Sequence, residues 1–138
     1  MTRLSSDDFA RLLAFRTSLR RFEHWSASQA RAAGLTPMQH QLLLAIKGHA
    51  DPRGPTIGEI AEYLLLRPHS AVELVDRGEA AGLVVRKRSD NDARVVRVRL
   101  TADASRRLSS LTSLHVAELR RFVPLLRDLT NAVDETPD

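Results

Sequence analysis

Residues 82–101 have the sequence GLVVRKRSDNDARVVRVRLT, and this stretch decides the fold of the chain. Two valine-rich runs, Val84–Arg88 and Arg94–Leu100, flank a polar segment at residues 89–93. β-Branched residues favour strands, whereas aspartate and asparagine favour the bend that joins two strands. The stretch therefore predicts a β-hairpin.

Basic residues dominate both arms of this hairpin: Arg86, Lys87, Arg88, Arg94, Arg97 and Arg99. Only two acidic residues, Asp90 and Asp92, lie among them. A basic two-stranded ribbon placed directly after a helix is suited to follow phosphates and to reach into a groove of nucleic acid. A solvated strand face is the alternative interpretation, and the segments before the hairpin decide between the two.

Composition narrows the class of protein. The 138 residues suffice for one domain with helical extensions. The net charge of +4 is too small to indicate a polyanionic partner by itself, so the concentration of base in the hairpin matters more. The absence of cysteine excludes a disulfide framework and a thiolate metal site. No signal peptide or membrane span is visible, which predicts a cytoplasmic protein without a membrane partner.

The N-terminal third predicts two helices. The first, over residues 7–33, follows a serine cap and carries apolar residues at spacings of three and four: Phe9, Leu12, Phe15, Leu19, Phe22 and Trp25. The second begins with Thr36-Pro37-Met38-Gln39, where Thr36 and Gln39 form a capping box, and it continues to about His49.

Two short helices precede the hairpin. Thr56 and Glu59 repeat the capping-box signal and start a helix that ends near Leu65. Pro68 fits the first turn of the next helix, which stops at Gly82. Two short helices joined by a tight turn and followed by a two-stranded wing form a winged helix-turn-helix.

A long helix follows the wing, and we expect Pro124 to split it. The terminal helices, residues 7–33 and 102–133, carry more apolar side chains than a winged helix buries, so we expect a second copy to cover them. The predicted fold is mainly α, with residues 1–138 as one domain. Its winged lobe covers residues 36–100, and the wing covers residues 84–100.

These motifs, taken in order, resemble the multiple-antibiotic-resistance regulator (MarR) family of bacterial transcription factors over nearly the whole chain. The resemblance is carried by Gly82-Leu83-Val84-x-Arg86, Asp92-x-Arg94, Val98-x-Leu100-Thr101 and Ser70-Ala71-Val72-x-Leu74-Val75-Asp76-Arg77. It implies a homodimeric DNA-binding regulator, which we expect to be a ligand-responsive repressor of a pseudo-palindromic operator in double-stranded DNA.

The chain departs from the family pattern at three positions. Gly78 stands where a leucine is usual, which predicts a lost core contact and about 1 kcal/mol of lost helix propensity. Ala93 replaces an arginine at the bend of the wing, and Ala104 replaces a glycine at the start of the long helix.

The first turns of the helix at 68–81 would present side chains to base edges. The candidates are Arg67, His69, Ser70 and Glu73, with Arg67 as a phosphate contact. Glu73 could accept from a cytosine amino group, although a solvated helix residue is an equal alternative.

Five wing residues complete the predicted interface. Lys87 and Arg88 are expected to contact the DNA backbone. The resemblance implies that Arg94 reaches the minor groove while Asp92 steadies a basic partner such as Arg86. Asp92 and Arg94 would share one face of a regular strand, and an intramolecular ion pair is the alternative for Arg94.

The family commonly binds a small aromatic effector between its dimer helices and the winged lobe. The candidates for such a pocket are Phe22, His24, Trp25, Arg31 and His40, although aromatic residues at helical spacing are more often core. No metal, cofactor or catalytic motif is predicted, so we do not expect an enzyme. A winged protein-interaction module is the rival function, and the basic wing argues against it.

Overall fold

The computed structural model describes residues 3–134, and their side chains as far as Leu129. The chain forms α1 (Ser6–Ala32), α2 (Pro37–Gly48), α3 (Ile57–Leu64), α4 (Pro68–Ala80), β1 (Val84–Arg88), β2 (Val96–Leu100) and α5 (Ala102–Asp134). This order confirms the mainly α winged helix-turn-helix. The first two and last four residues of the predicted 1–138 domain lie outside the described part.

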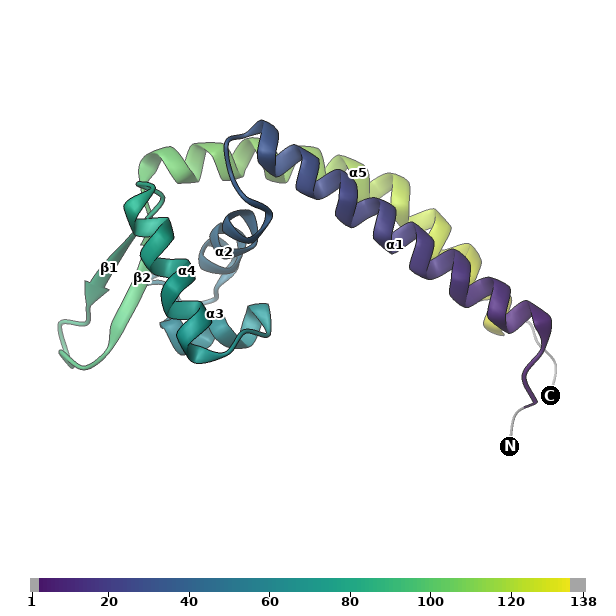
Figure 1. The fold of residues 1–138 in the computed structure, drawn as a ribbon, viewed down its shortest axis with the longest axis horizontal. Helices are drawn as coiled ribbons and strands as arrows, with labels where there is room; N and C mark the ends of the chain where they lie inside the picture. The colour runs from purple at the N-terminus through teal and green to yellow at the C-terminus, as the bar shows by residue number, and fades with distance from the viewer. Residues whose placement is uncertain (1–2, 135–138) are drawn as a thin grey trace.

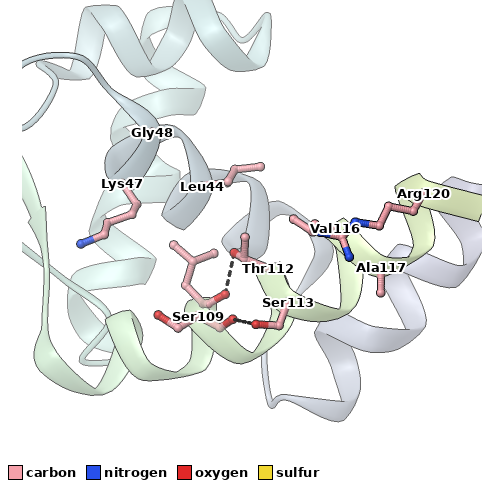
Figure 2. A pocket seen from close by; sticks show the side chains of 10 residues that line it. Leu44, Lys47, Gly48, Ser109, Thr112, Ser113, Val116, Ala117 and Arg120 are labelled. Carbon is pink, nitrogen blue, oxygen red and sulfur yellow. Dashed lines mark hydrogen bonds between the residues drawn. The ribbon is translucent and has the colours of Figure 1, made fainter. Parts of the chain in front are cut away.

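Figure 1 shows a compact lobe and a long helical arm. The lobe contains α2, α3, α4 and the β1–β2 hairpin, and it is closed by a core of fully buried side chains: Leu42, Leu43, Ile60, Val75, Leu83, Val84 and Val98. The arm consists of α1 and α5, which lie side by side and carry both termini away from the lobe. The start of α5 also packs against α2, and a cavity opens between these two helices (Figure 2).

Three helices begin with capping boxes, and the sequence predicts two of them, at Thr36 and Thr56. Thr36 Oγ1 accepts from the backbone N–H of Gln39 at 3.0 Å, and Gln39 Oε1 accepts from the backbone N–H of Thr36 at 3.0 Å. Thr56 and Glu59 repeat this exchange at the start of α3. In α1 the N-cap is Ser5, which pairs with Asp8. These short-range bonds satisfy helix N–H groups that would otherwise lack partners.

The turn between α3 and α4 depends on a leucine in an unfavourable conformation. Leu65 adopts φ 55° and ψ 43°, the left-handed region that L-residues other than glycine avoid. Its side chain is 92% exposed and so gains little burial in return. Arg67 then forms the N-cap of α4, and Pro68 takes the first turn as expected.

The prediction that Gly78 loses a core contact is wrong. Gly78 is buried in α4, and a Cβ atom there would lie 3.2 Å from both Leu42 Cδ2 and Val84 Cγ2. The glycine therefore allows α2 and β1 to approach α4 closely, and their side chains fill the space that a leucine would occupy. The propensity cost of a mid-helix glycine, about 1 kcal/mol, remains.

The hairpin is antiparallel, with Val84 opposite Leu100 and Arg88 opposite Val96. The second arm begins at Val96, two residues later than predicted, so residues 89–95 form a longer connection. Asp92 and Arg94 consequently lie in this connection, and their expected placement on one face of a strand is wrong. Outside this hairpin, Thr56 forms an isolated bridge to Arg97, which holds the start of α3 against the wing.

The expected break at Pro124 is also wrong, because α5 continues through it to Asp134. Proline removes one backbone N–H and so loses one helix hydrogen bond, but the turns on both sides keep theirs. Phe122 packs its ring 5.5 Å from that of Phe22 in α1, which supports α5 beside the proline. Among the described residues, no helix is both long and apolar enough to cross a membrane.

Candidate nucleic-acid interface

The first turns of α4 present polar side chains on the side opposite the core. Ala71, Val75 and Gly78 face inward and are buried. Arg67, His69 and Glu73 are exposed and Ser70 is half-buried. Within the described part of the chain, none of these four side chains makes a hydrogen bond or ion pair, so their polar groups are available to a ligand.

Arg86 joins the wing to the back of α4. Its guanidinium Nη2 donates to Asp76 Oδ1 at 2.6 Å, and its Nη1 donates to Glu79 Oε1 at 2.6 Å. The predicted pairing of Arg86 with Asp92 is therefore wrong. Arg86 lies on the strand face that turns toward α4, whereas Asp92 lies in the connection beyond both strands. The two ion pairs fix the position of the wing relative to α4.

Asp92 instead orders the tip of the wing. Its Oδ1 accepts from the backbone N–H of Arg94 at 3.0 Å and from Arg94 Nε at 3.3 Å. The Arg94 side chain is nevertheless 92% exposed. The ion pair predicted as an alternative is present, but it engages only Nε, and the largely exposed side chain leaves the two terminal nitrogens of the guanidinium without a partner among the described residues.

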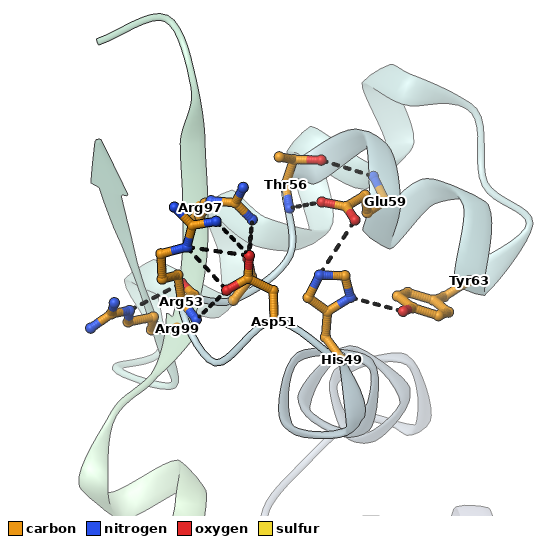
Figure 3. Close-up of polar contacts among 9 residues, drawn as sticks. His49, Asp51, Arg53, Thr56, Glu59, Tyr63, Arg97 and Arg99 are labelled. Carbon is orange, nitrogen blue, oxygen red and sulfur yellow. Dashed lines mark hydrogen bonds and ion pairs between the residues drawn. The ribbon is translucent and has the colours of Figure 1, made fainter. Parts of the chain in front are cut away.

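A second basic cluster was missed by the sequence analysis and is shown in Figure 3. Asp51 accepts from Arg53 Nη2 at 2.7 Å, and Arg97 Nη1 lies 3.7 Å from the same carboxylate. Hydrogen bonds from the Arg53 side chain and then its backbone hold the pKa of Asp51 well below its usual range. Arg97 Nη1 also donates to the Gly54 carbonyl at 2.9 Å. The signal for this cluster was the Asp51-x-Arg53 spacing followed by the alternation of Arg97 and Arg99.

Beside this cluster, His49 joins the end of α2 to α3. Its Nδ1 lies 2.8 Å from Tyr63 Oη, and its Nε2 lies 3.3 Å from Glu59 Oε2 (Figure 3). The backbone hydrogen bond from Thr56 is the main cause that lowers the pKa of Glu59. This arrangement orients α3, and it does not point toward the exposed turns of α4.

The predicted effector residues are brought together only in part. Phe22 and His40 line a cavity of about 560 Å³ between α1 and α2. Trp25 does not line it, but packs its ring 4.8 Å from that of His115 on α5. His24 and Arg31 are exposed and do not line the cavity.

His40 and Ser26 are the buried polar residues that the described structure places beside this cavity. His40 is 3% exposed, and within the described residues its Nδ1 has no hydrogen-bond partner. Burial, followed by the nearby His115, lowers the pKa of His40. His115 Nδ1 donates to the Leu111 carbonyl at 2.8 Å, and its Nε2 lies 2.7 Å from Ser26 Oγ. His40 therefore favours its neutral form.

The cavity between α2 and α5, about 570 Å³, was not predicted. Figure 2 shows Lys47 and Arg120 near opposite ends of it, with Leu44 and Val116 between them. Thr112 Oγ1 donates to the Leu108 carbonyl at 2.7 Å within α5, so its hydroxyl oxygen remains available as an acceptor. The lining combines apolar surface with two cations.

The winged lobe described above is also the part of the chain that a known protein family matches. The protein-family model described as the MarR family matches residues 33–95, which contain α2, α3, α4, β1 and the tip of the wing. The HTH-type transcriptional repressor MdtR of Bacillus subtilis (strain 168) is 26% identical over 95 residues, or 69% of this chain. That match covers 59% of the length of MdtR.

Two solved structures share the fold along almost the whole chain. AbsC, a MarR family transcriptional regulator from Streptomyces coelicolor, has a TM-score of 0.76 at 21% identity and covers 96% of this chain and 90% of its own. The S. aureus MepR–DNA complex has a TM-score of 0.68 at 17% identity, with 97% of this chain and 100% of the MepR chain covered. The long α1–α5 arm is therefore part of the shared fold.

Proposed function

We propose that this chain is a DNA-binding transcriptional regulator of the MarR family, whose model matches residues 33–95. The proposal rests on the different contacts made by the two sides of α4. One side is tied to the wing by the two 2.6 Å ion pairs of Arg86, while the exposed first turns keep their polar groups unpaired. A rigid helix and wing that present unsatisfied donors outward suit a groove of DNA.

The roles of the interface residues follow from their positions. His69, Ser70 and Glu73 would meet base edges in the major groove, and Arg67 at the N-cap would contact a phosphate. On the wing, Lys87 and Arg88 would contact the backbone. Arg94 would enter the minor groove, because it lies in the connection between the strands and its side chain is 92% exposed. MepR, a protein of the same fold, was solved in complex with DNA, which supports this assignment.

We propose that the protein acts as a homodimer. The arm formed by α1 and α5, the region predicted at residues 7–33 and 102–133, exposes large apolar side chains far from the lobe: Phe9 65%, Leu12 59%, Leu13 66%, Phe15 39%, Leu119 43%, Val123 40% and Leu125 52%. A second copy would remove this surface from water. Two-fold symmetry would then place two α4 helices on a pseudo-palindromic operator.

We further propose that the protein is a repressor that a small effector releases from its operator. MdtR is named a transcriptional repressor. The cavity beside Phe22 and His40 offers aromatic and apolar contacts, and the cavity with Lys47 and Arg120 suits an anionic aromatic molecule. Both cavities lie against α2, so an occupant of either would act on the junction between the arm and the lobe.

Replacing Arg94 with alanine tests the interface. We expect Arg94→Ala to bind operator DNA at least about tenfold more weakly at matched salt, from the loss of one groove contact. Arg106→Gln is the control, because Arg106 is a 73% exposed arginine on α5 outside the proposed interface. Equal affinity of Arg94→Ala and the control would remove Arg94 from the interface. A monomer at micromolar concentration in sedimentation equilibrium would refute the dimer.

A further inference from the structure

The face of the wing that points away from α4 carries a basic pocket of about 420 Å³. Its lining comes from the loop before α3, from both strands and from the connection between them: Arg53, Lys87, Arg88, Ser89, Asp90, Asn91, Arg97 and Arg99. Five of these eight residues are basic and one is acidic. Lys87 and Arg88 already have a proposed role on DNA backbone phosphates, but no role in DNA binding has been proposed for Arg53, Arg97 and Arg99.

Strand register explains why the cations gather on one face. Lys87 lies directly opposite Arg97, and Val85 lies opposite Arg99, so Lys87, Arg97 and Arg99 share the outer face. The other face carries Val84 and Val98, which are buried in the core. Like charges directly opposite each other on a strand pair destabilise it unless a counter-ion lies between them.

A close approach of the preceding loop supplies the remaining arginine. Gly54 adopts φ +96°, and a Cβ atom there would lie 2.2 Å from the Val98 carbonyl oxygen, so no other residue fits without moving the loop. This contact allows the Val98 N–H to donate to the Pro55 carbonyl at 2.8 Å. The loop is thereby held against β2, and Arg53 is placed beside Arg99.

The charges of the pocket are only partly neutralised. Asp51 is shared between Arg53 and Arg97. Within the described residues, no carboxylate pairs with Lys87, Arg88 or Arg99. The pocket thus keeps a surplus of positive charge that an anion would compensate.

Two of the arginines are also oriented in advance. Arg97 is held by the Gly54 carbonyl at 2.9 Å, and Arg99 Nε donates to the Arg53 carbonyl at 3.1 Å (Figure 3). Anchoring Arg99 through Nε leaves its two terminal nitrogens as a fork, the geometry that binds two oxygens of one phosphoryl group. Fixing a guanidinium before binding reduces the entropy lost on binding.

We propose that this outer wing pocket binds a phosphoryl group, separately from the base contacts of α4 and the groove contact of Arg94. Arg99 and Lys87 are the principal ligands, and Arg97 and Arg53 shape the pocket. The phosphoryl group belongs to a small phosphorylated molecule that binds the DNA-free protein, and contact with a DNA backbone phosphate alone would be the competing outcome.

The first experiment titrates inorganic phosphate into the DNA-free protein at constant ionic strength and follows backbone amide shifts by NMR. A small-molecule site predicts saturable shifts at residues 87–91 and 97–99. It also predicts binding at least about tenfold weaker in the double variant Lys87→Gln/Arg99→Gln, which removes two charge-assisted contacts. Arg106→Gln should bind phosphate like the wild type. Thermal unfolding of each variant checks folding, and Lys87→Gln alone serves if the double variant unfolds.

The second experiment measures how the DNA affinity of the same variants depends on salt. If the double variant lowers the salt slope by about one to two, at about 0.9 per phosphate contact, and the protein does not respond to free phosphate, the pocket residues belong to the DNA interface and the proposal of a small-molecule site is overturned. If the double variant binds free phosphate as tightly as the wild type, the proposal is overturned whatever the salt slope. A protein that binds no DNA would refute the proposed function, while the phosphate titration would still decide the pocket.

Discussion

Replacing Gly78 with leucine is expected to destabilise the winged lobe, although leucine is the better helix former. Gly78 lies in the interior of α4, so the replacement gains up to about 1 kcal/mol of helix propensity. The packing acts in the opposite direction. A Cβ atom alone would already approach Leu42 and Val84 to 3.2 Å, and both of these side chains are at most 1% exposed.

For leucine, the cost of overpacking should exceed the gain in helix propensity. For alanine, the two contributions to the free energy of unfolding should nearly cancel. Overpacking a filled core costs about 1–3 kcal/mol, and leucine adds three carbon atoms beyond the Cβ. We therefore expect Gly78→Leu to lower the free energy of unfolding by about 1–2 kcal/mol and Gly78→Ala to change it by less than about 1 kcal/mol. Gly58 is the matched control, because a Cβ there meets only Thr56 Oγ1 at 3.9 Å. Gly58→Ala should stabilise the protein by about 0.5–1 kcal/mol.

Urea denaturation followed by circular dichroism measures these differences. Combining Gly78→Leu with Val84→Ala should recover part of the loss, with a coupling energy of at least about 0.5 kcal/mol, because the shortened valine makes room for the leucine. A stabilised Gly78→Leu, or additive effects in the double variant, would show that α4, α2 and β1 do not meet at this glycine.

Three further outcomes follow from the described contacts. Leu65→Gly should raise the free energy of unfolding by about 0.5–1 kcal/mol, because it relieves a left-handed backbone and removes a side chain that buries little; a lower urea midpoint would contradict this. Arg86→Gln should lower the free energy of unfolding by about 1–2 kcal/mol, a figure discounted for the partial exposure of the ion pair. A double-mutant cycle with Glu79→Gln that shows no coupling would refute the ion pair. Since burial lowers the pKa of His40 below its ordinary value of 6.5, the unfolded state binds a proton first. Stability should therefore fall as pH drops below about 6.5 and level off above it. His40→Gln should flatten this part of the stability profile, and an unchanged profile would exclude His40 as its cause.

Local signals predicted most of the helices and strands correctly. The capping boxes at Thr36 and Thr56 involve residues three positions apart, so their geometry is fixed by the sequence that contains them. The valine-rich arms likewise predicted the hairpin. The error at Pro124 arose because a single lost hydrogen bond was weighed without the packing of Phe122 against α1.

The contacts of the candidate site depend on distant segments and were harder to predict. The partner of Arg86 is set by which face of β1 turns toward α4, and sequence alone did not give the register of one element against the other. The outer wing pocket joins Arg53 to Lys87 and Arg99, which are more than thirty residues away along the chain. Only the approach of the loop at Gly54 to β2 brings them together.

The salt dependence of DNA binding tests the central claim most directly. The protein would be used to select fragments of its own genome, and its affinity for a retained fragment would be measured over a range of salt concentrations. With Arg67, Lys87 and Arg88 on phosphates in each of two copies, the logarithm of the association constant should fall against the logarithm of salt concentration with a slope of about −5. An affinity that does not change with salt would contradict DNA recognition by α4 and the wing.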